Sequence, residues 1–513
     1  MQYNVIVIGA GSGGGSIACR LSEDSSRSVL LLEAGPDYPD FETLPDPIKY
    51  SYGTRPASSG GKHNWNFRGK ITEHQLEIPV PRGKVTGGSS AINGAAFIRG
   101  RPEDYDAWAA TGLPEWSYEK VLPFFRKMET DTDYPGGDFH GSDGPIIVRR
   151  YKREEWAPGQ TEFYEACRAL GFPDNPDYNH PETYGVGSAP FNNPGGVRLS
   201  TALAYIAPAR HRLNLTIRPN TMVHRILFSG KRAIGVLAES GGQKFSIYAD
   251  LIVLSAGAIG SPHLLMLSGV GPANQLEQIG VKVIHDLPGV GQNLRDDPNI
   301  TVTWRTRPEV ELDAQKPRIQ LYLRYADPAL GNQSNSMMIG MNSFTTKHRD
   351  PDNAIGISMT PMMYLRAGAG QIILTSPDAT VQPFLDYRLM EPAIDRERGR
   401  EVIRFCLEIA NQKEFRPLVS ELLSPEPQAL ESDKSLDEWL SHNIRSGVHL
   451  SCTCRMGPAS DPMAVTDQYG KVHGLDGIRI ADASIMVNQP RCSTNCPSIL
   501  MGERISEFIK QDI

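Results

Sequence analysis

Three glycines near the N-terminus have the spacing that binds a pyrophosphate. Gly9, Gly11 and Gly14 form the pattern G-x-G-x-x-G, and Glu33 follows about 20 residues later. In such a pattern the first glycine permits a tight turn, the second lets the backbone approach phosphate oxygens, and the third lets a helix pack closely on a strand. The acidic residue accepts hydrogen bonds from ribose hydroxyls. These residue types at this spacing predict a dinucleotide-binding site.

The elements that must position these residues are also visible in the pattern. Residues 5–8 and 29–32 are short apolar runs, as in strands buried on both faces, and apolar residues recur at helical spacing between them. The start of that helix would offer free N–H groups to phosphate. This order predicts an α/β fold with a Rossmann-like, doubly wound dinucleotide-binding domain.

Two loops near the C-terminus carry side chains suited to acid–base chemistry. His449 lies in residues 446–457 and Asn495 in residues 490–497, and an expected strand ending at Asp482 lies between them. Late strand ends of this kind hold the ribityl chain in FAD proteins, and the chain has no second G-x-G-x-x-G for a nicotinamide nucleotide. FAD is therefore the favoured cofactor. A histidine beside a flavin can act as general base toward an alcohol, although a lone histidine is also commonly structural.

The bulk properties of the chain exclude several classes of protein. With 513 residues, 40% of them hydrophobic and 22% charged, the chain is long enough for two or three globular domains. A net charge of −7 without a basic cluster argues against a nucleic-acid partner. We find no apolar run of about 18 residues, so we expect no transmembrane segment. The first strand leaves no room for a secretory signal, which predicts a cytoplasmic protein.

The middle of the chain predicts a second domain inserted into the first. Further helices are expected at residues 102–128, 160–170 and 396–411. Strands 214–217, 222–228 and 251–254 suit the first domain, with 244–248 as a hairpin partner. Strands 300–304, 319–325, 336–344, 355–364, 371–375 and 382–387 alternate as in a large antiparallel sheet. We therefore assign residues 1–155, 190–300 and 440–513 to the FAD-binding domain, and residues 156–189 and 301–439 to a substrate-binding domain.

Several segments together resemble the glucose–methanol–choline (GMC) family of FAD oxidoreductases over essentially the whole chain. They are the glycine motif and residues 83–93, 140–145, 198–205, 257–271, 287–294 and 472–484. The small residues at 83–94 alone indicate either a close approach to a ligand or a tight turn before a helix. The resemblance implies the GMC fold, with a substrate domain built on an antiparallel sheet.

The resemblance also implies roles for residues. His449 falls on the catalytic base, which takes the hydroxyl proton while hydride goes to flavin N5, and Asn495 falls on its partner position. The substrate would be a small alcohol, the product an aldehyde or ketone, and the electron acceptor O₂, a quinone or another acceptor. The residues that the resemblance assigns to FAD are Gly9, Gly11, Ser12, Gly14, Glu33, Ala34, Arg82, Gly83, Gly88, Ser90, Asn93, Gly94, Ala95, Val223, Ala256, Gly257, Asp482, Ala483, Asn495 and Pro497.

The chain departs from the family pattern at several positions. Ile92 stands where some members carry the histidine bonded covalently to FAD, so we expect noncovalent FAD. Thr86 stands where an aliphatic residue or Trp is usual, Asp297 where His is common, Cys452 where Gly is usual and Val487 where Pro is common.

Two sets of sulfur-containing residues each allow two structural interpretations. The four C-terminal cysteines, Cys452, Cys454, Cys492 and Cys496, are either a metal or redox cluster or, as we favour, packed thiols without metal. The seven cysteines of the chain do not suggest a disulfide framework. Six methionines in the second domain, Met337, Met338, Met341, Met359, Met362 and Met363, are expected mostly in the core, or on one face in an adaptable apolar pocket.

Two alternatives to alcohol oxidation stay open. Similar flavoproteins include hydroxynitrile lyases and fatty-acid photodecarboxylases, which use FAD without net alcohol oxidation. A non-catalytic flavoprotein is a further alternative, against which the presence of both His449 and Asn495 argues. The sequence leaves the oligomeric state open.

Overall fold

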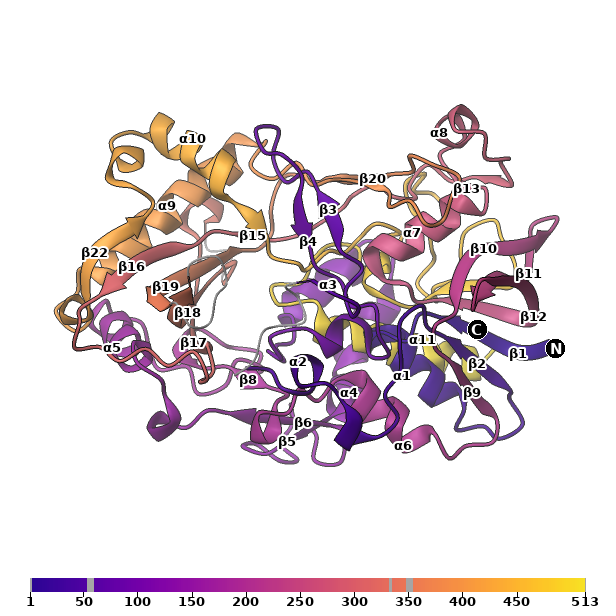
Figure 1. Cartoon of the computed structure of the whole chain (residues 1–513), viewed down its shortest axis with the longest axis horizontal. Coiled ribbons are helices and arrows are strands. Elements are labelled where there is room, and N and C mark those ends of the chain that lie inside the picture. The colour runs from indigo at the N-terminus through magenta and orange to yellow at the C-terminus, as the bar shows by residue number, and fades with distance from the viewer. Residues whose placement is uncertain (1, 53–59, 332–334, 347–353, 513) are drawn as a thin grey trace.

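The computed structural model describes residues 2–52, 60–331, 335–346 and 354–512. Two large sheets lie at opposite ends of an elongated molecule (Figure 1). Both chain termini lie beside the sheet that contains β1, and the sheet that contains β16–β19 lies at the other end. The predicted combination of a doubly wound domain with an antiparallel sheet is confirmed.

The first sheet is built around β1 (Gln2–Ile8). Its strand order is β10-β11-β12-β1-β2-β9, and β24 also pairs with β12. The strands β2, β9, β12 and β24 run parallel to their neighbours β1, β2, β1 and β12, whereas β10, β11 and β12 are antiparallel to one another. The bounds are β2 Val29–Leu32, β9 Leu215–Arg218, β10 Met222–Ser229, β11 Arg232–Ser240, β12 Gln243–Leu254 and β24 Ile478–Ile480.

Helices bring the glycine loop and the C-terminal segment together. Helix α1 (Ser12–Leu21) starts directly after the glycine turn and packs against α11 (Asn495–Lys510). Helix α7 (Gly257–Leu267) follows the end of β12. The carboxyl ends of β1, β12 and β24 therefore face the starts of three helices, at the edge where doubly wound sheets bind ligands.

The second sheet is antiparallel and has the order β22-β16-β19-β18-β17-β7, with β15 and β23 at its border. Helices α5 (Gln160–Ala169) and α9 (Ala393–Ala410) pack against it and against each other. The bounds are β7 Gly185–Ser188, β15 Pro298–Asn299, β16 Val302–Thr306, β17 Ile319–Tyr325, β18 Met337–Thr346, β19 Ala354–Met363, β22 Val419–Ser424 and β23 Arg445–Ser446.

Shorter elements connect and cover the two sheets. The helices are α2 Asp46–Lys49, α6 Ala207–Ala209, α8 Ala273–Gln278 and α10 Asp433–Asn443, and the small strands are β3 Phe67–Gly69, β4 Ile78–Val80, β5 Glu129–Asp131, β6 Ile146–Arg150, β8 Pro190–Phe191, β13 Val270–Gly271 and β14 His285–Asp286.

The structure differs from the prediction in three regions. The expected helix 102–128 is interrupted at Gly112, whose φ is +93°, and becomes α3 (Pro102–Ala110), a 3₁₀ turn Pro114–Trp116 and α4 (Tyr118–Met128). The expected strands 244–248 and 251–254 are one strand, β12, whose hairpin partner is the unpredicted β11. Strands β20 (Gln371–Ile373) and β21 (Phe384–Asp386) form a separate pair instead of extending the second sheet.

The predicted domain boundaries stay a prediction, but strand pairing crosses two of them. β15 and β23, which were assigned to the FAD-binding domain, pair with each other, and β15 also pairs with β19 of the second sheet. Lys70 of the first domain forms a bridge with Asp386 of β21. Residues 371–387 therefore adjoin the first domain rather than the second sheet.

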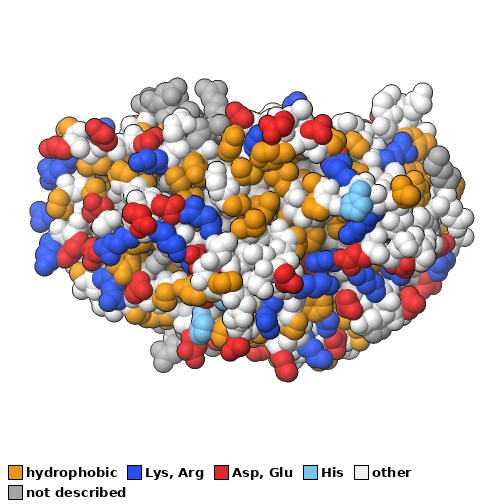
Figure 2. Space-filling view, turned by 90° about the horizontal axis from the view of Figure 1, so that it is seen from below, with side chains coloured by type: hydrophobic (Ala, Val, Ile, Leu, Met, Phe, Trp, Pro, Cys, Tyr) orange, Lys and Arg blue, Asp and Glu red, His pale blue; other side chains and the backbone are white. Residues whose placement is uncertain are grey.

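The surface and the helices add two observations. Figure 2 shows acidic and basic side chains interspersed with apolar ones across the face seen from below, without a single charged field. Over the described ranges, none of the helices combines the length and the apolar character that a membrane crossing requires.

Candidate active site

A cavity of about 1050 Å³ extends from the glycine loop of the first sheet to side chains of the second sheet. Of the predicted FAD residues and the predicted base and partner, most line it. They are Gly9, Gly11, Ser12, Glu33, Ala34, Arg82, Gly83, Gly88, Asn93, Gly94, Ala95, Val223, Ala256, Gly257, His449, Asp482, Ala483 and Asn495. Gly14, Ser90 and Pro497 do not belong to the described lining.

The glycine loop has the geometry that a pyrophosphate requires. A Cβ added to Gly14 would lie 1.8 Å from the carbonyl oxygen of Gly9, so helix α1 packs directly on the turn after β1. A Cβ added to Gly88 would lie 2.7 Å from Cα of Gly11, which brings a second glycine loop against the first. The two loops form a backbone-lined cradle at the start of α1, where free N–H groups favour an anion.

Glu33 directly follows β2 and holds the loops of the cradle in place by hydrogen bonds. Its carboxylate accepts hydrogen bonds from the backbone N–H groups of Ala10, at 3.0 Å, and Gly35, at 2.8 Å. Burial raises the pKa of Glu33 to about 7, against the opposing effect of these two hydrogen bonds. The carboxylate lines the cavity, as a partner for ribose hydroxyls would.

Asp482 joins the end of β24 to the start of α7. One carboxylate oxygen accepts hydrogen bonds from N–H of Gly257, at 2.9 Å, and from the hydroxyl of Ser261, at 2.5 Å. The other oxygen accepts from N–H of Ser484, at 2.8 Å. Burial raises the pKa of Asp482, so its hydrogen bonds partly compensate for a desolvated charge. The residue fixes the position of this wall of the cavity.

His449 lines the cavity and is held from behind by two buried aspartates. Its Nδ1 lies 2.8 Å from Oδ1 of Asp297, and its backbone N–H donates to Oδ1 of Asp296, also at 2.8 Å. Burial lowers the pKa of His449, but the carboxylates of Asp297 and Asp296 outweigh burial and hold that pKa above its ordinary value. The sequence motif identified His449, whereas Asp297 was visible only as a departure from the family pattern.

The loop that carries His449 has an unusual backbone. Val448 has φ +60°, a left-handed conformation that is rare for a β-branched residue. Its carbonyl accepts a hydrogen bond from Arg82, and its N–H donates to Oγ of Ser446 at 2.9 Å. Strain of this kind persists where surrounding contacts enforce it, as they commonly do at functional sites.

Asn495 lies at the first position of α11 and contacts the glycine helix. Its Oδ1 accepts a hydrogen bond from the hydroxyl of Ser12 at 2.8 Å, while its buried Nδ2 has no hydrogen-bond partner in the part of the chain that the structure describes. A buried amide donor without a partner is costly, so a bound acceptor atom would satisfy it. This N–H group suits either the cofactor or an alcohol oxygen.

The far end of the cavity is aromatic and sulfur-rich. Its lining includes Tyr151, Phe191, Tyr322, Met338 and Met362. Burial and then the Asp297 charge raise the pKa of Tyr322, which indicates that this aromatic group lies close to the His449–Asp297 pair. The prediction for the six methionines is confirmed in both parts, because Met338 and Met362 line the pocket and the other four are buried in the core.

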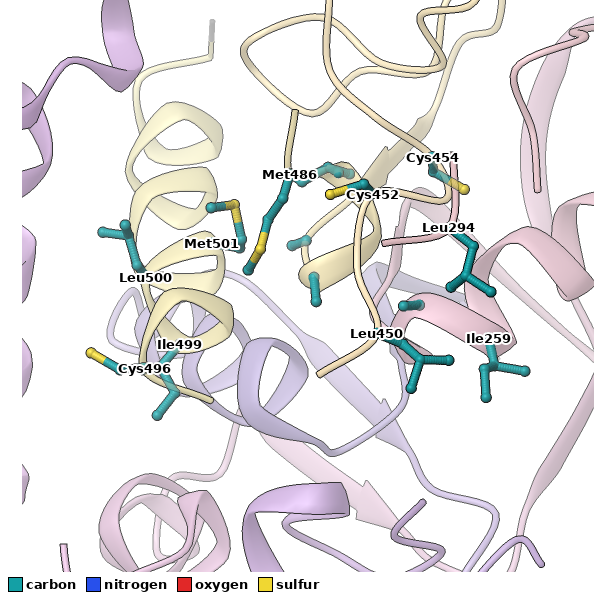
Figure 3. Close-up of a cluster of buried hydrophobic side chains, with 14 of the residues drawn as sticks. Ile259, Leu294, Leu450, Cys452, Cys454, Met486, Cys496, Ile499, Leu500 and Met501 are labelled. Atoms are coloured by element: carbon teal, nitrogen blue, oxygen red, sulfur yellow. The ribbon is translucent and has the colours of Figure 1, made fainter. Parts of the chain in front are cut away.

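The four C-terminal cysteines are buried free thiols. Figure 3 shows Cys496 at the start of α11, on the opposite side of that helix from Cys452 and Cys454. Burial raises the pKa of Cys452 to about 12 and raises those of the other three well above the ordinary value. Such thiols behave as small apolar side chains. Cys452 has φ +71°, which explains why glycine is usual at this position.

A second group of acids surrounds His140 outside the cavity. The imidazole contacts Glu129 at 3.0 Å, Asp131 at 3.1 Å and Asp177 at 2.7 Å. Arg150 pairs with Asp131 and Asp177, and Arg99 pairs with Glu129. The arginines supply the cations that these carboxylates need, which makes the group a structural ion network.

Comparison with known proteins agrees with this geometry. The family models described as GMC oxidoreductase match residues 4–299 and 367–502. A GMC-type oxidoreductase of Rhodococcus erythropolis is 33% identical, with 99% of this chain and 98% of the relative covered. An oxygen-dependent choline dehydrogenase of Chromohalobacter salexigens is 36% identical, with 99% of this chain and 95% of the relative covered.

Solved structures show the same fold. The pyridoxine 4-oxidase from Mesorbium loti superposes with a TM-score of 0.91 at 26% identity, with 99% of each chain covered. A formate oxidase superposes with a TM-score of 0.89 at 23% identity, with 100% of this chain and 98% of that chain covered. The glycine cradle, the late Asp482 and the matches across most of the chain agree. The chain therefore belongs to the GMC oxidoreductase family of FAD-dependent enzymes that act on CH–OH donors.

Proposed function

We propose that this chain oxidises an alcohol to an aldehyde or ketone, with His449 as the base. The observation that carries the proposal is that His449 lines the same cavity as the dinucleotide cradle and the aromatic side chains of the second sheet. Because Asp297 holds Nδ1, the lone pair of Nε2 is the one available to an alcohol proton. The cavity would hold FAD beside this histidine, and the bound flavin would supply the acceptor for the hydride of the carbinol carbon.

Asn495 has the complementary task in this proposal. Its unpartnered Nδ2 donates a hydrogen bond to the substrate oxygen and orients the alcohol, while Ser12 fixes the side chain from the other side. The cradle of Gly9, Gly11 and Gly88 holds the pyrophosphate noncovalently, and the aliphatic side chain of Ile92 lines the wall where some members form a covalent bond. The remaining predicted FAD contacts are part of the same proposal.

We further infer that the substrate is a neutral alcohol with an aromatic or apolar body. Tyr151, Phe191 and Tyr322 offer ring faces, and Met338 and Met362 offer adaptable apolar surface. Arg445 also lines the cavity, and its positive charge disfavours a cationic alcohol. We expect benzylic and medium-chain primary alcohols to reduce the flavin with a higher kcat/KM than choline; a clear preference for choline would reject this inference.

Relatives support an alcohol donor and O₂ as one acceptor. The oxygen-dependent choline dehydrogenase and the pyridoxine 4-oxidase are named for substrates that carry hydroxyl groups. We therefore propose O₂ as acceptor, with a quinone or another acceptor as the alternative.

A cytoplasmic location stays a prediction. The comparisons give no support to the lyase or photodecarboxylase alternative.

Anaerobic stopped-flow reduction in the dark tests the proposed function. A good alcohol should bleach the flavin of the wild-type protein, which a lyase or photodecarboxylase would not show. His449→Ala should retain FAD and be reduced at least about a hundredfold more slowly, because general-base positioning is typically worth about 10²- to 10⁴-fold. Asn495→Ala should cost less, since it orients the alcohol without taking the proton.

The matched control is His442→Ala, which removes an exposed histidine of α10. Its rate of flavin reduction should equal that of the wild type. A His449→Ala protein that keeps FAD and is reduced at the wild-type rate would show that another group is the base.

A further inference from the structure

The environment of Asp297 is built around its carboxylate. Oδ1 lies 2.8 Å from Nδ1 of His449 and accepts a second hydrogen bond, at 2.6 Å, from Nε2 of Gln489. A Cβ added to Gly447 would lie 2.6 Å from Oδ2, so the loop approaches the carboxylate as closely as a glycine allows. Asp297 is itself buried, and its Oδ2 has no hydrogen-bond partner among the described residues.

A buried carboxylate with one unpaired oxygen is costly. Over the ranges that the structure describes, His449 is the residue that forms a direct ion pair with Asp297. The sequence resemblance places His at this position in other members of the family. A histidine can donate or accept toward Nδ1, whereas an ionised aspartate only accepts. In this chain a carboxylate, which accepts hydrogen bonds, therefore lies next to Nδ1 of the proposed base.

We propose that Asp297 is a positioning residue for alcohol oxidation, which holds His449 in the tautomer with hydrogen on Nδ1 and stabilises the imidazolium that forms during the reaction. The inference rests on the proposed role of His449. In the step concerned, the O–H bond of the alcohol breaks and an N–H bond forms at Nε2, while the carbinol hydride leaves with its electron pair to FAD. Asp297 exchanges no proton in this step.

The pH dependence of the reaction gives a signature of this role. The charged groups around His449 are Asp297, Asp296 and Arg82, and Arg366 acts on both aspartates. Since the two carboxylates hold the pKa of His449 above its ordinary value, flavin reduction should rise with pH through that raised pKa and then reach a plateau.

Two substitutions that nearly preserve side-chain size separate the effect of the Asp297 charge from the effect of its hydrogen bond with Gln489. Asp297→Asn retains an oxygen that Gln489 can hold toward Nδ1 but removes the charge. We expect the rise in rate to move to lower pH and the plateau to fall at least about tenfold, as when a charged hydrogen bond to a catalytic base is lost. Gln489→Leu removes the 2.6 Å hydrogen bond to Asp297 but keeps the charge of that carboxylate. The pH at which the rate of flavin reduction rises should therefore not move to a lower value in this variant.

Asp296 needs its own control because its carboxylate also raises the pKa of His449. Burial and then the Asp297 charge raise the pKa of Asp296 to about 6. Its carboxylate contacts the backbone N–H of His449 and the hydroxyl of Ser446 rather than the ring. Asp296→Asn should therefore shift the rise in rate less than Asp297→Asn does.

A measurement independent of activity completes the test. In the wild-type holoenzyme labelled with ¹⁵N-histidine, the signal lost in His449→Ala identifies His449. It should show hydrogen on Nδ1 at high pH and a pKa above the ordinary histidine value of about 6.5. The same signal in Asp297→Asn should titrate at lower pH than in the wild type.

The outcomes distinguish the two proposals. If His449→Ala is slow but Asp297→Asn has an unchanged pH midpoint and an unchanged histidine titration, the role of Asp297 is rejected and His449 remains the base. If Asp297→Asn does not fold, the wild-type tautomer decides: hydrogen on Nε2 rejects the role, and hydrogen on Nδ1 together with the raised pKa supports it.

Discussion

Two alanine substitutions in one glycine motif should affect different properties, FAD binding in one variant and stability in the other. Gly11→Ala and Gly14→Ala each add a single methyl group, three residues apart, at the start of α1. Gly11 has φ −80° and ψ −157°, which alanine adopts without strain, and the nearest atom to its added Cβ is Cα of Gly88 at 3.8 Å. The polypeptide therefore has room at Gly11, and that room lies at the edge of the cavity.

Gly14 has no such room. Its added Cβ would lie 1.8 Å from the oxygen and 2.9 Å from the carbon of the Gly9 carbonyl. Reaching an ordinary contact distance requires α1 to move by roughly 1.5 Å away from the turn, and overpacking of this kind costs about 1–3 kcal/mol or more. The better helix propensity of alanine returns only about 0.5–1 kcal/mol. We expect Gly14→Ala to lower the free energy of unfolding by about 2 kcal/mol.

The assay combines flavin content with thermal unfolding of FAD-stripped protein. Gly11→Ala should unfold within about 1 °C of the wild type but bind FAD at least about tenfold more weakly, because its methyl group occupies the space that the pyrophosphate needs. Gly14→Ala should unfold several degrees lower even without FAD, at about 2–4 °C per kcal/mol for a domain of this kind.

Equal unfolding temperatures for the two stripped variants would refute the packing argument. Unchanged FAD affinity in Gly11→Ala would show that the pyrophosphate does not lie against this glycine. Either result would separate the fold of the loop from its role in binding.

Three further predictions follow from other parts of the molecule. Acid precipitation should release yellow FAD into the supernatant, since Ile92 replaces the histidine of covalent members; flavin retained in the pellet would contradict noncovalent binding. Elemental analysis of the holoenzyme should find no zinc or iron held by the four C-terminal cysteines, and about one metal ion per chain that is lost on their replacement by serine would contradict it. His140→Gln should destabilise the protein more at pH 6 than at pH 9.5. Burial lowers the pKa of His140, but Asp131, Asp177 and Glu129 raise it to about 10. Its stabilising charge is therefore fully present below the unfolded pKa of about 6.5 and is lost as pH rises toward 10. Urea midpoints of His140→Gln and of the exposed control His442→Gln measure this, and an equal loss at both pH values would refute it.

The glycine loop and its strands could be predicted from the sequence because their signals are local. A strand buried on both faces is continuously apolar, as residues 5–8 are, and the turn after it requires glycine whatever the rest of the chain does. Helix α5 and strand β17 were predicted almost residue for residue for the same reason, since each contains its own periodicity. Resemblance to a family added His449 and Asn495, whose chemistry has no periodic signature.

Local patterns failed where contacts between distant segments decide the structure. Residues 371–387 have the alternation of strands, but β20 and β21 pair with each other and bridge to Lys70 of the first domain instead of joining the second sheet. The partner of β12 was assigned to the wrong segment because β11 lies between β10 and β12, and strand order is set by turn geometry and packing rather than by composition.

The partnership of His449 with Asp297 was decided by tertiary structure alone. The two residues are 152 positions apart, and Gln489 approaches the same carboxylate from a third segment. The sequence determined that an acceptor-only side chain stands at position 297, where the family commonly has histidine. Only the folding of β15, β23 and the C-terminal loops against one another places that carboxylate behind the base, because a hydrogen bond depends on distances of a few ångströms that no local pattern encodes.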